Sequence, residues 1–229
     1  MTIICEPVTK QALLERPPET LACLLSRLGG ISPERIAADP PPGTAGVDDL
    51  LTPRSGGDRL YELVDAMLVE KAMGYYESVL ATVLIHMIYQ FLDLHDLGIV
   101  GGPDGMLQLV PGLVRAPDVS FIRWDRIPDA DLSVDAFPEI APDLAVEVIS
   151  KGNTPGEMRR KLQEYFDAGC RMVWYLYPEE RAVHVYTSPD ECSIVAEDGV
   201  LDGSPVLPGF SVPVQEWLKR ARVRKGDSL

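Results

Sequence analysis

The stretch P-D-L-A-V-E-V-I-S, residues 142–150, decides the fold of this chain. From its third residue to its eighth it is apolar except for Glu147, which is typical of a central strand covered on both faces. T-P-G-E, residues 154–157, follows as a capping box with proline at the first helical position. The predicted helix runs to about Ala168, and Gly169 can end it. A buried strand followed by a crossover helix indicates an α/β sheet.

The spacing of apolar residues predicts the secondary structure on either side of this strand and helix. Residues 60–71 form a predicted hairpin with its turn at Asp65–Ala66. Apolar residues then recur at helical spacing from Met73 to Leu94, and Gly98 can end that helix. Further strands are predicted at 99–101, 106–110, 118–123, 171–177 and 182–187, with a terminal helix at 214–223. Together they indicate a mixed α/β sheet with helices on its faces.

The length and the amino-acid composition suggest one domain preceded by an N-terminal arm. The chain has 229 residues with 46% hydrophobic content, enough for one substantial core and too little to require two. Residues 1–57 carry Pro/Gly-rich segments such as A-D-P-P-P-G-T-A and predict an extended or loosely helical arm, with a short helix around 18–28. We expect the compact domain to cover residues 58–229.

Several classes of protein are disfavoured. Apolar runs such as 79–85 are too short to span a bilayer. The start, M-T-I-I-C-E-P, does not resemble a secretory signal, so we expect a cytoplasmic protein. The four cysteines are scattered without C-x-x-C spacing and the three histidines do not cluster, which disfavours zinc. No phosphate loop of the G-x-x-x-x-G-K type is present in the sequence.

The net charge of −14 argues against strong electrostatic binding of nucleic acid, because phosphate binding relies on lysine and arginine. A local basic groove remains compatible with it. Basic residues gather at 159–161, around the strand at 118–123, and at 219–225, where a solvated helix end is the simpler interpretation.

Two acids in predicted strands are the first candidates for function. Asp118 begins a strand after the bend at Ala116–Pro117, and by itself a turn aspartate is the simpler interpretation. Glu147 lies among apolar neighbours, where a carboxylate costs free energy unless it is paired or binds a metal. A structural ion pair with an arginine is the alternative for Glu147.

Two helical residues complete the candidate set. Lys161 lies on the shoulder of an apolar helical stripe, so its ammonium could reach the end of the sheet; a snorkelling lysine is the alternative. Glu77 aligns with the core side of the first long helix, although it could be an exposed acid that pairs locally. Two strand carboxylates, a helix acid and a lysine are suited to Mg²⁺ or Mn²⁺ and to phosphodiester hydrolysis.

The chain resembles a known family in the order and spacing of several motifs. These are P-D-V-S-F, P-D-L-A-V-E-V-I-S, the K-x-x-x-Y of Lys161 and Tyr165, A-G-C-R-M-V-W-Y-L-Y-P, L-Y-E-L-V-D-A-M-L-V-E-K, L-G-I-V-G-G and V-L-P-G-F. They resemble the Uma-type restriction endonuclease family, part of the PD-(D/E)XK nuclease superfamily, over roughly residues 58–212. The resemblance implies a restriction-endonuclease-like mixed sheet flanked by helices.

The resemblance also implies roles for the candidates. Asp118 matches the acid of the "PD" motif and Glu147 the second acid, with Mg²⁺ or Mn²⁺ held between them. The lysine expected two residues after that acid is replaced by Ile149. Lys151 and Lys161 are both possible substitutes, and Lys161 matches the family's lysine before the tyrosine. Glu77 resembles an extra helix acid of some superfamily members.

Two main hypotheses follow for the function. The first is a Mg²⁺-dependent endonuclease that hydrolyses DNA, with weak non-specific binding because the chain is acidic. The second is a non-catalytic module that keeps the nuclease fold for binding and forms a homodimer, motivated by the displaced lysine and the charge. Hydrolysis of another phosphate ester is a third, weaker hypothesis.

Overall fold

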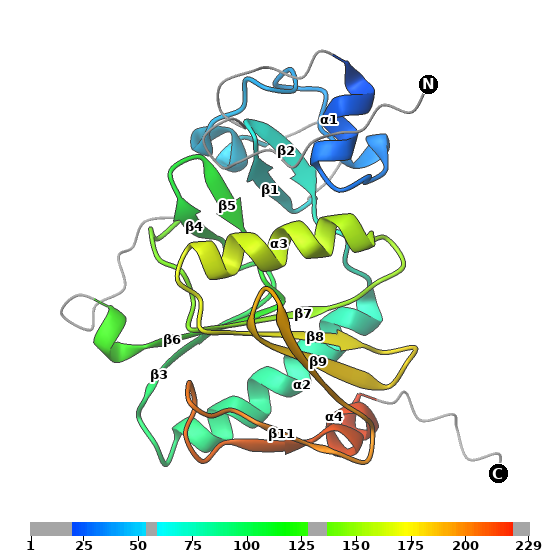
Figure 1. Ribbon diagram of the computed structural model, residues 1–229. Helices are drawn as coiled ribbons and strands as arrows, with labels where there is room; N and C mark the ends of the chain where they lie inside the picture. Colours follow the sequence, from blue (N-terminus) through cyan, green and yellow to red (C-terminus); the bar gives the residue numbers. More distant parts are fainter. Residues whose placement is uncertain (1–19, 54–58, 128–136, 222–229) are drawn as a thin grey trace, which may run out of the picture.

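A six-stranded sheet forms the centre of the protein (Figure 1). The computed structural model describes residues 20–53, 59–127 and 137–221. The strand order is β10-β9-β8-β7-β6-β3. Only β7 and β8 pair in parallel; the other described neighbours in this sheet are antiparallel. The strands are β3 (Gly98–Gly101), β6 (Val119–Arg123), β7 (Leu144–Val148), β8 (Met172–Tyr177), β9 (Ala182–Ser188) and β10 (Glu191–Val195).

The parallel pair is joined by a crossover helix, α3 (Pro155–Asp167). The helix starts where the capping box predicts, since the Glu157 backbone N–H donates to Thr154 Oγ1 at 3.1 Å. It ends before Gly169, whose φ of +99° few other residues adopt. Every residue of β7 is buried, as expected for a strand between two covered faces. The prediction of a central strand and a crossover helix is confirmed.

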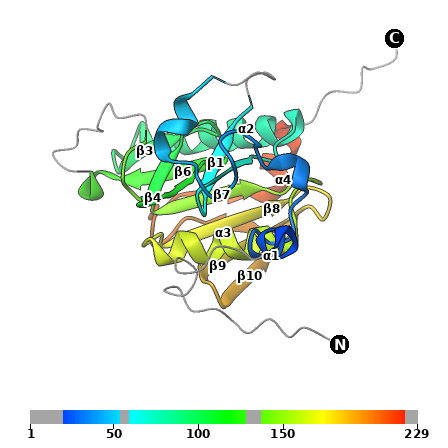
Figure 2. The ribbon, with the colours of Figure 1, turned by 90° about the horizontal axis from the view of Figure 1, so that it is seen from above.

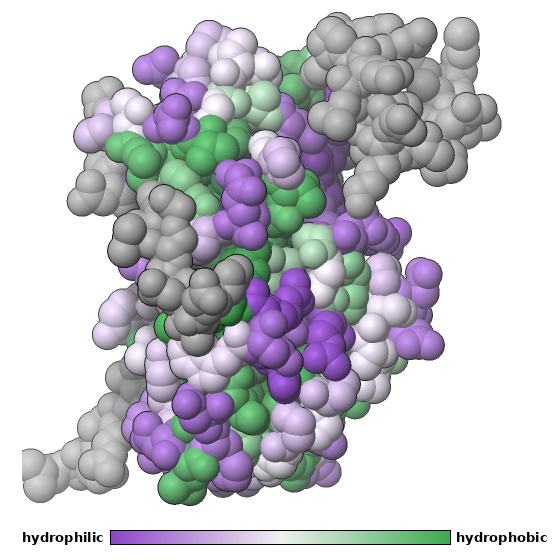
Figure 3. Space-filling view, turned by 90° about the vertical axis from the view of Figure 1, so that its left-hand side faces the viewer, coloured by the Kyte–Doolittle hydropathy of each residue, from purple (hydrophilic) through white to green (hydrophobic). Residues whose placement is uncertain are grey.

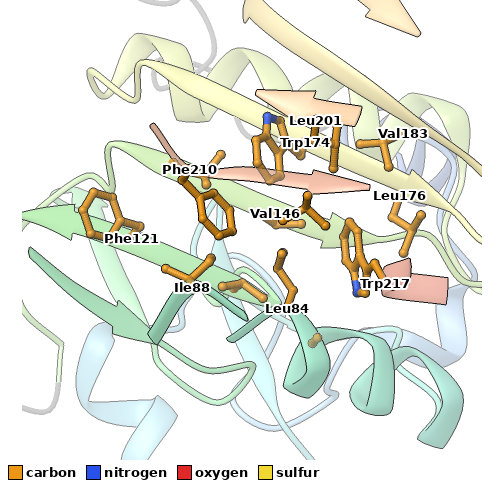
Figure 4. Packing of buried hydrophobic residues seen from close by; sticks show 14 of the residues in the cluster. Leu84, Ile88, Phe121, Val146, Trp174, Leu176, Val183, Leu201, Phe210 and Trp217 are labelled. Atoms are coloured by element: carbon orange, nitrogen blue, oxygen red, sulfur yellow. The ribbon is translucent and has the colours of Figure 1, made fainter. Parts of the chain in front are cut away.

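One face of the sheet is covered by α2 (Tyr75–Leu92), α4 (Val214–Arg220) and the hairpin of β11 (Val200–Asp202) and β12 (Ser211–Pro213). Figure 4 shows Val146 of β7 near Leu84 of α2 and Trp217 of α4, and Trp174 of β8 beside Leu201 of β11. The Trp217 indole also donates to the Leu80 carbonyl at 2.8 Å, which satisfies its buried N–H. This apolar layer is the main core.

The other face carries α3, and a second sheet lies beyond it (Figures 1 and 2). Its order is β2-β1-β5-β4. The strands are β1 (Tyr61–Val64), β2 (Met67–Glu70), β4 (Leu107–Val110) and β5 (Leu113–Arg115). The hairpin turn falls at Asp65 and Ala66, as predicted, and both have positive φ (50° and 55°), as two-residue hairpin turns require.

The segment before the hairpin packs on this second sheet. Helix α1 (Leu21–Arg27) and Ile31 form a cluster with apolar residues of β1 and β2. Two short 3₁₀ helices follow, η1 (Pro33–Arg35) and η2 (Val47–Leu51). Gly29 and Gly156 allow α1 to approach the start of α3, since a Cβ on Gly156 would lie 2.6 Å from the Gly29 carbonyl oxygen. The predicted boundary at residue 57 lies in the undescribed range 54–58.

Some local predictions were wrong. Gly98 does not end α2, which stops at Leu92; Gly98 instead begins β3, where a Cβ would lie 2.1 Å from the Ile122 carbonyl oxygen. The strands β5, β10, β11 and β12 were not predicted. They are short or largely exposed, so they lack the apolar signal on which the prediction relied. The predicted terminal helix extends beyond the observed α4 into residues outside the described range.

The surface is mixed in polarity on the face seen in Figure 3, where hydrophilic residues gather near the middle between smaller hydrophobic areas. Within the described residues, no helix combines the length and apolar character needed to cross a membrane.

The core predicts a clear contrast between two leucines near α2. Leu84 is fully buried, whereas Leu94 is 82% exposed. We expect Leu84→Ala to lower the free energy of unfolding by about 2–5 kcal/mol, because it removes buried methyl groups and leaves a cavity. Leu94→Ala should change it by less than about 0.5 kcal/mol. Urea unfolding measures both, and equal losses would contradict the assigned core.

Candidate active site

Strand register places the two predicted acids on one face of the sheet. Val119 pairs with Val146 in the antiparallel ladder between β6 and β7. Continuing the register by one residue puts Asp118 opposite Glu147, where Cβ atoms are typically about 5 Å apart. Residues such as Val119 and Val146 face α2, so the alternating neighbours Asp118 and Glu147 face α3. Both carboxylates therefore lie under the crossover helix.

Helix α3 supplies two partners to Glu147. Lys161 Nζ lies 3.2 Å from Glu147 Oε1, and the Tyr165 hydroxyl donates to the same oxygen at 2.6 Å. Lys161 and Tyr165 are four residues apart and share one helix face. Lys161 is only 2% exposed, so it lies inside the structure rather than on the predicted shoulder toward solvent. Its ammonium reaches the sheet, as the sequence indicated.

A third carboxylate, Glu62 of β1, shares the Lys161 ammonium. Lys161 Nζ lies 3.0 Å from Glu62 Oε1, and Arg115 Nη1 donates to Glu62 Oε2 at 2.7 Å. The Ala116 backbone N–H also donates to Oε1, at 3.1 Å. Glu62 has no exposed surface. Each of its oxygens therefore has a buried cationic partner, which offsets the cost of desolvation.

Asp118 has a different set of contacts. Its Oδ2 accepts a short hydrogen bond of 2.6 Å from the Val148 backbone N–H. Its Oδ1 lies 2.6 Å from Lys71 Nζ, outside hydrogen-bonding geometry. Lys71 follows β2 and also donates to the Pro103 carbonyl at 3.0 Å. We call the six charged residues of this region the buried charge cluster: Glu62, Lys71, Arg115, Asp118, Glu147 and Lys161.

The pKa values in the cluster follow from burial and from these ion pairs. Burial raises the pKa of Glu147, and the nearby Asp118 adds to this, while Lys161 opposes it. For Glu62, burial is outweighed by Lys161 and Arg115, and its pKa falls to about 2. Burial disfavours the charged form of Lys161, but Glu147 and Glu62 more than compensate and raise its pKa. Burial also raises the pKa of the Tyr165 hydroxyl well above its ordinary value.

A second network holds α3 against the hairpin. Arg115 donates to Glu164 Oε2, and Glu164 Oε1 accepts from Arg160 at 2.7 Å. Arg160 in turn contacts both carboxylate oxygens of Asp65 in the hairpin turn, at 2.8 and 3.0 Å. These contacts fix the helix that carries Lys161 relative to the strand that carries Glu62.

A cavity of about 660 Å³ is lined by segments that follow two strands near the cluster. Its wall contains residues 72–74, directly after Lys71, and residues 149–152, directly after β7. Tyr76, Glu77 and Tyr177 also line it. Its volume is within the range of small-molecule sites. None of the six cluster residues lines this cavity, and the chain links the two at Lys71 and at the end of β7.

The donor set of the cluster is compatible with a hard divalent ion. Magnesium is commonly held by one or two carboxylates together with waters, and Asp118 and Glu147 supply two from adjacent strands. Asp118 Oδ1 accepts no hydrogen bond and is contacted by the Lys71 ammonium, so it is a buried oxygen that could serve as a ligand if Lys71 moved away. Among the described residues, no three His, Cys, Asp or Glu side chains come together as a ready metal cage. A divalent ion would therefore depend on these two acids.

The structure brings together three of the four predicted site residues: Asp118, Glu147 and Lys161. Glu77 is half-buried on the cavity wall and makes no described contact with them. The alternative lysine, Lys151, has a side chain that is 90% exposed and lies 3.5 Å from Glu179. The roles assigned to these residues stay predictions.

Three members of the cluster, Glu62, Lys71 and Arg115, were not predicted as site residues from the sequence. Glu62 lies in the apolar strand Y-E-L-V, in the same kind of setting that singled out Glu147. The same signal, an acid among apolar residues of a strand, could have identified Glu62. Lys71 carries no comparable signal, because a lysine at the end of an exposed hairpin would look the same in sequence.

The protein is thus a mixed α/β structure in which two acids face the crossover helix and Lys161 of that helix contacts one of them. A family model described as "Putative restriction endonuclease", Uma2, matches residues 48–215. The chain belongs to this family, and the resemblance inferred from its motifs is confirmed.

A solved structure supports the same fold. It is described as a putative nuclease belonging to DUF820, from Anabaena variabilis. The two share 17% sequence identity with a TM-score of 0.66, over 76% of this chain and 97% of the other. The restriction-endonuclease-like fold is thereby confirmed. Among curated proteins, none matches this sequence.

The low pKa of Glu62 predicts that the free energy of unfolding depends on pH in the acid range. Its folded pKa of about 2 is below the ordinary 4.5, so its contribution is full above pH 4.5 and is lost as pH falls toward 2. We expect Glu62→Gln to lower the free energy of unfolding near pH 7 by on the order of 3 kcal/mol, since it leaves buried cations with one partner fewer. The difference from wild type should shrink as the pH falls below 4.5.

Urea unfolding at several pH values measures this difference. Glu216→Gln is the matched control, because Glu216 is exposed and pairs with Arg220 on α4. Its effect should stay below about 1 kcal/mol at every pH. A Glu62→Gln deficit that is the same at pH 6 and pH 3 would contradict the assigned pKa.

Proposed function

We propose that this protein is a divalent-metal-dependent endonuclease that hydrolyses DNA phosphodiester bonds. The observation that carries the proposal is the placement of Asp118 and Glu147 opposite each other on adjacent strands, with Lys161 against Glu147. Membership of the Uma2 family supports the reaction class. Mg²⁺ is the proposed ion, with Mn²⁺ as a substitute, because carboxylate oxygens suit both.

Asp118 and Glu147 would hold the ion. When bound, such an ion polarises a phosphodiester and lowers the pKa of a coordinated water. The Val148 N–H fixes the Asp118 carboxylate, and the Tyr165 hydroxyl fixes Glu147, so neither acid depends on the ion for its orientation. Lys161 holds Glu147 with a positive charge, and its ammonium can orient a water at that carboxylate or steady developing negative charge.

The adjacent cavity is the proposed route for the substrate. Its wall includes residues 72–74, which follow β2, and residues 149–152, which follow β7. Glu77 would act on the substrate only from this cavity wall. Because the chain has a net charge of −14, non-specific DNA binding should be weak. We therefore propose a substrate that is short, structured or delivered by a partner.

Asp118→Asn tests this function. The amide keeps the size of the side chain but removes the negative charge that a divalent ion requires. We expect Mg²⁺-dependent cleavage of plasmid and oligonucleotide DNA to fall by about a hundredfold or more, since lesser changes around metal ligands already cost 10- to 100-fold. Calorimetry should show weaker Mn²⁺ binding as well.

The control is Asp125→Asn, which changes an aspartate that is 63% exposed and pairs with Arg123. Cleavage and Mn²⁺ binding should both stay near wild type. Full cleavage by Asp118→Asn, or equal loss in both variants, would contradict the proposed site.

A second candidate function is a non-catalytic module that binds DNA or protein, with the homodimer expected from the sequence. The observation that favours it is that each acid of the cluster already has a cationic partner. In that case wild-type protein binds no Mn²⁺ and leaves DNA intact, while sedimentation shows a dimer. Mg²⁺-dependent cleavage that is lost in Asp118→Asn would exclude it.

A further inference from the structure

A second buried lysine, Lys71, has no role in the function proposed above. Its side chain is 3% exposed, and its ammonium lies 2.6 Å from Asp118 Oδ1. Lys161 holds the other acid, Glu147, from the opposite element, α3. Each proposed metal ligand thus has its own lysine, but the two lysines are held very differently.

Lys161 is anchored between two carboxylates, Glu147 and Glu62, at 3.2 and 3.0 Å. Lys71 has one carboxylate contact, which lies outside hydrogen-bonding geometry, and one hydrogen bond to the Pro103 carbonyl at 3.0 Å. Moving the Lys71 ammonium off Asp118 therefore breaks one ion pair and can leave its hydrogen bond in place. Moving the Lys161 ammonium would leave two buried carboxylates without it.

Two cations can compete for only one oxygen of Asp118, namely Oδ1. Oδ2 is occupied by the Val148 N–H at 2.6 Å. Oδ1 is contacted by Lys71 alone among the described residues. A divalent ion bound to Oδ1 would lie about 2.0–2.2 Å from it, close to where the ammonium now lies. An ion that takes the position of the ammonium on Oδ1 cannot bind while the ammonium stays there, because two cations that close repel strongly in a buried region.

We propose that Lys71 competes with the divalent ion for Asp118: its ammonium holds Oδ1 while the ion is absent, and ion binding requires it to leave. The inference rests on the proposed function only in taking Asp118 as a metal ligand. It follows that the resting protein binds divalent ions weakly.

Mn²⁺ titration of the full chain by calorimetry tests the competition. Lys71→Met removes the competing charge while keeping most of the side-chain volume, so we expect it to bind Mn²⁺ at least tenfold more tightly than wild type. A purely structural role for Lys71 predicts the opposite direction, because damage to the site weakens binding. Mn²⁺ should also raise the thermal unfolding midpoint of Lys71→Met more than that of wild type.

Lys151→Met is the matched control. It removes one lysine charge from the wall of the cavity of about 660 Å³, but the Lys151 side chain is 90% exposed and pairs with Glu179. Its Mn²⁺ affinity should stay within about twofold of wild type. Lys71→Arg, which keeps the charge, should bind Mn²⁺ as weakly as wild type.

Lys71→Gln gives the same test if Lys71→Met does not fold, since it removes the charge but retains a donor for Asp118. Tighter Mn²⁺ binding by either neutral variant supports the competition, even if no DNA is cleaved and the proposed function fails. Unchanged, weaker or absent Mn²⁺ binding in the folded neutral variant overturns it. Such a result would leave the nuclease function standing if wild type cleaves DNA and Asp118→Asn does not.

Discussion

The Lys161 ammonium, held between Glu62 and Glu147, is the interaction on which the rest of the site depends. It joins three elements that are distant in sequence: β1, β7 and α3. Removing it would leave two buried carboxylates short of positive charge, a situation that costs several kcal/mol in proteins. The contact also sets the orientation of Glu147 toward Asp118, because Tyr165 and Lys161 hold the same oxygen from one helix face. The geometry of the proposed metal site is thus a consequence of how α3 docks.

The buried charge cluster balances three carboxylates with three cations, and this balance shapes what the site can do. Buried charges persist only when they are paired, so a divalent ion cannot simply be added to the resting arrangement. An extra positive charge must displace a cation or arrive with an anion. A phosphodiester substrate supplies such an anion, which links the proposed chemistry to the unequal anchoring of Lys71 and Lys161.

The sequence was most informative where one local signal agreed with another. The apolar run around Glu147, followed by the T-P-G-E box, correctly placed β7 and the start of α3. The hairpin turn at Asp65–Ala66 was also located, although alanine rarely adopts positive φ. The prediction failed for β10 and β11, whose exposed residues carry little apolar signal. It failed again at Gly98. Glycine often ends a helix, but here it is needed because a Cβ would clash with the neighbouring strand.

The sequence by itself determined the central strand, the crossover helix and the conspicuous positions of Asp118, Glu147 and Lys161. It could do so because an ionisable residue within an apolar pattern is costly, and the cost is visible from neighbours in the chain. The tertiary structure alone decided which charges meet. Glu62 finds Arg115 across 53 residues, and Lys71 finds Asp118 from a different sheet. Such pairings depend on how helices and sheets stack in space, and the local pattern around each residue carries no record of that stacking.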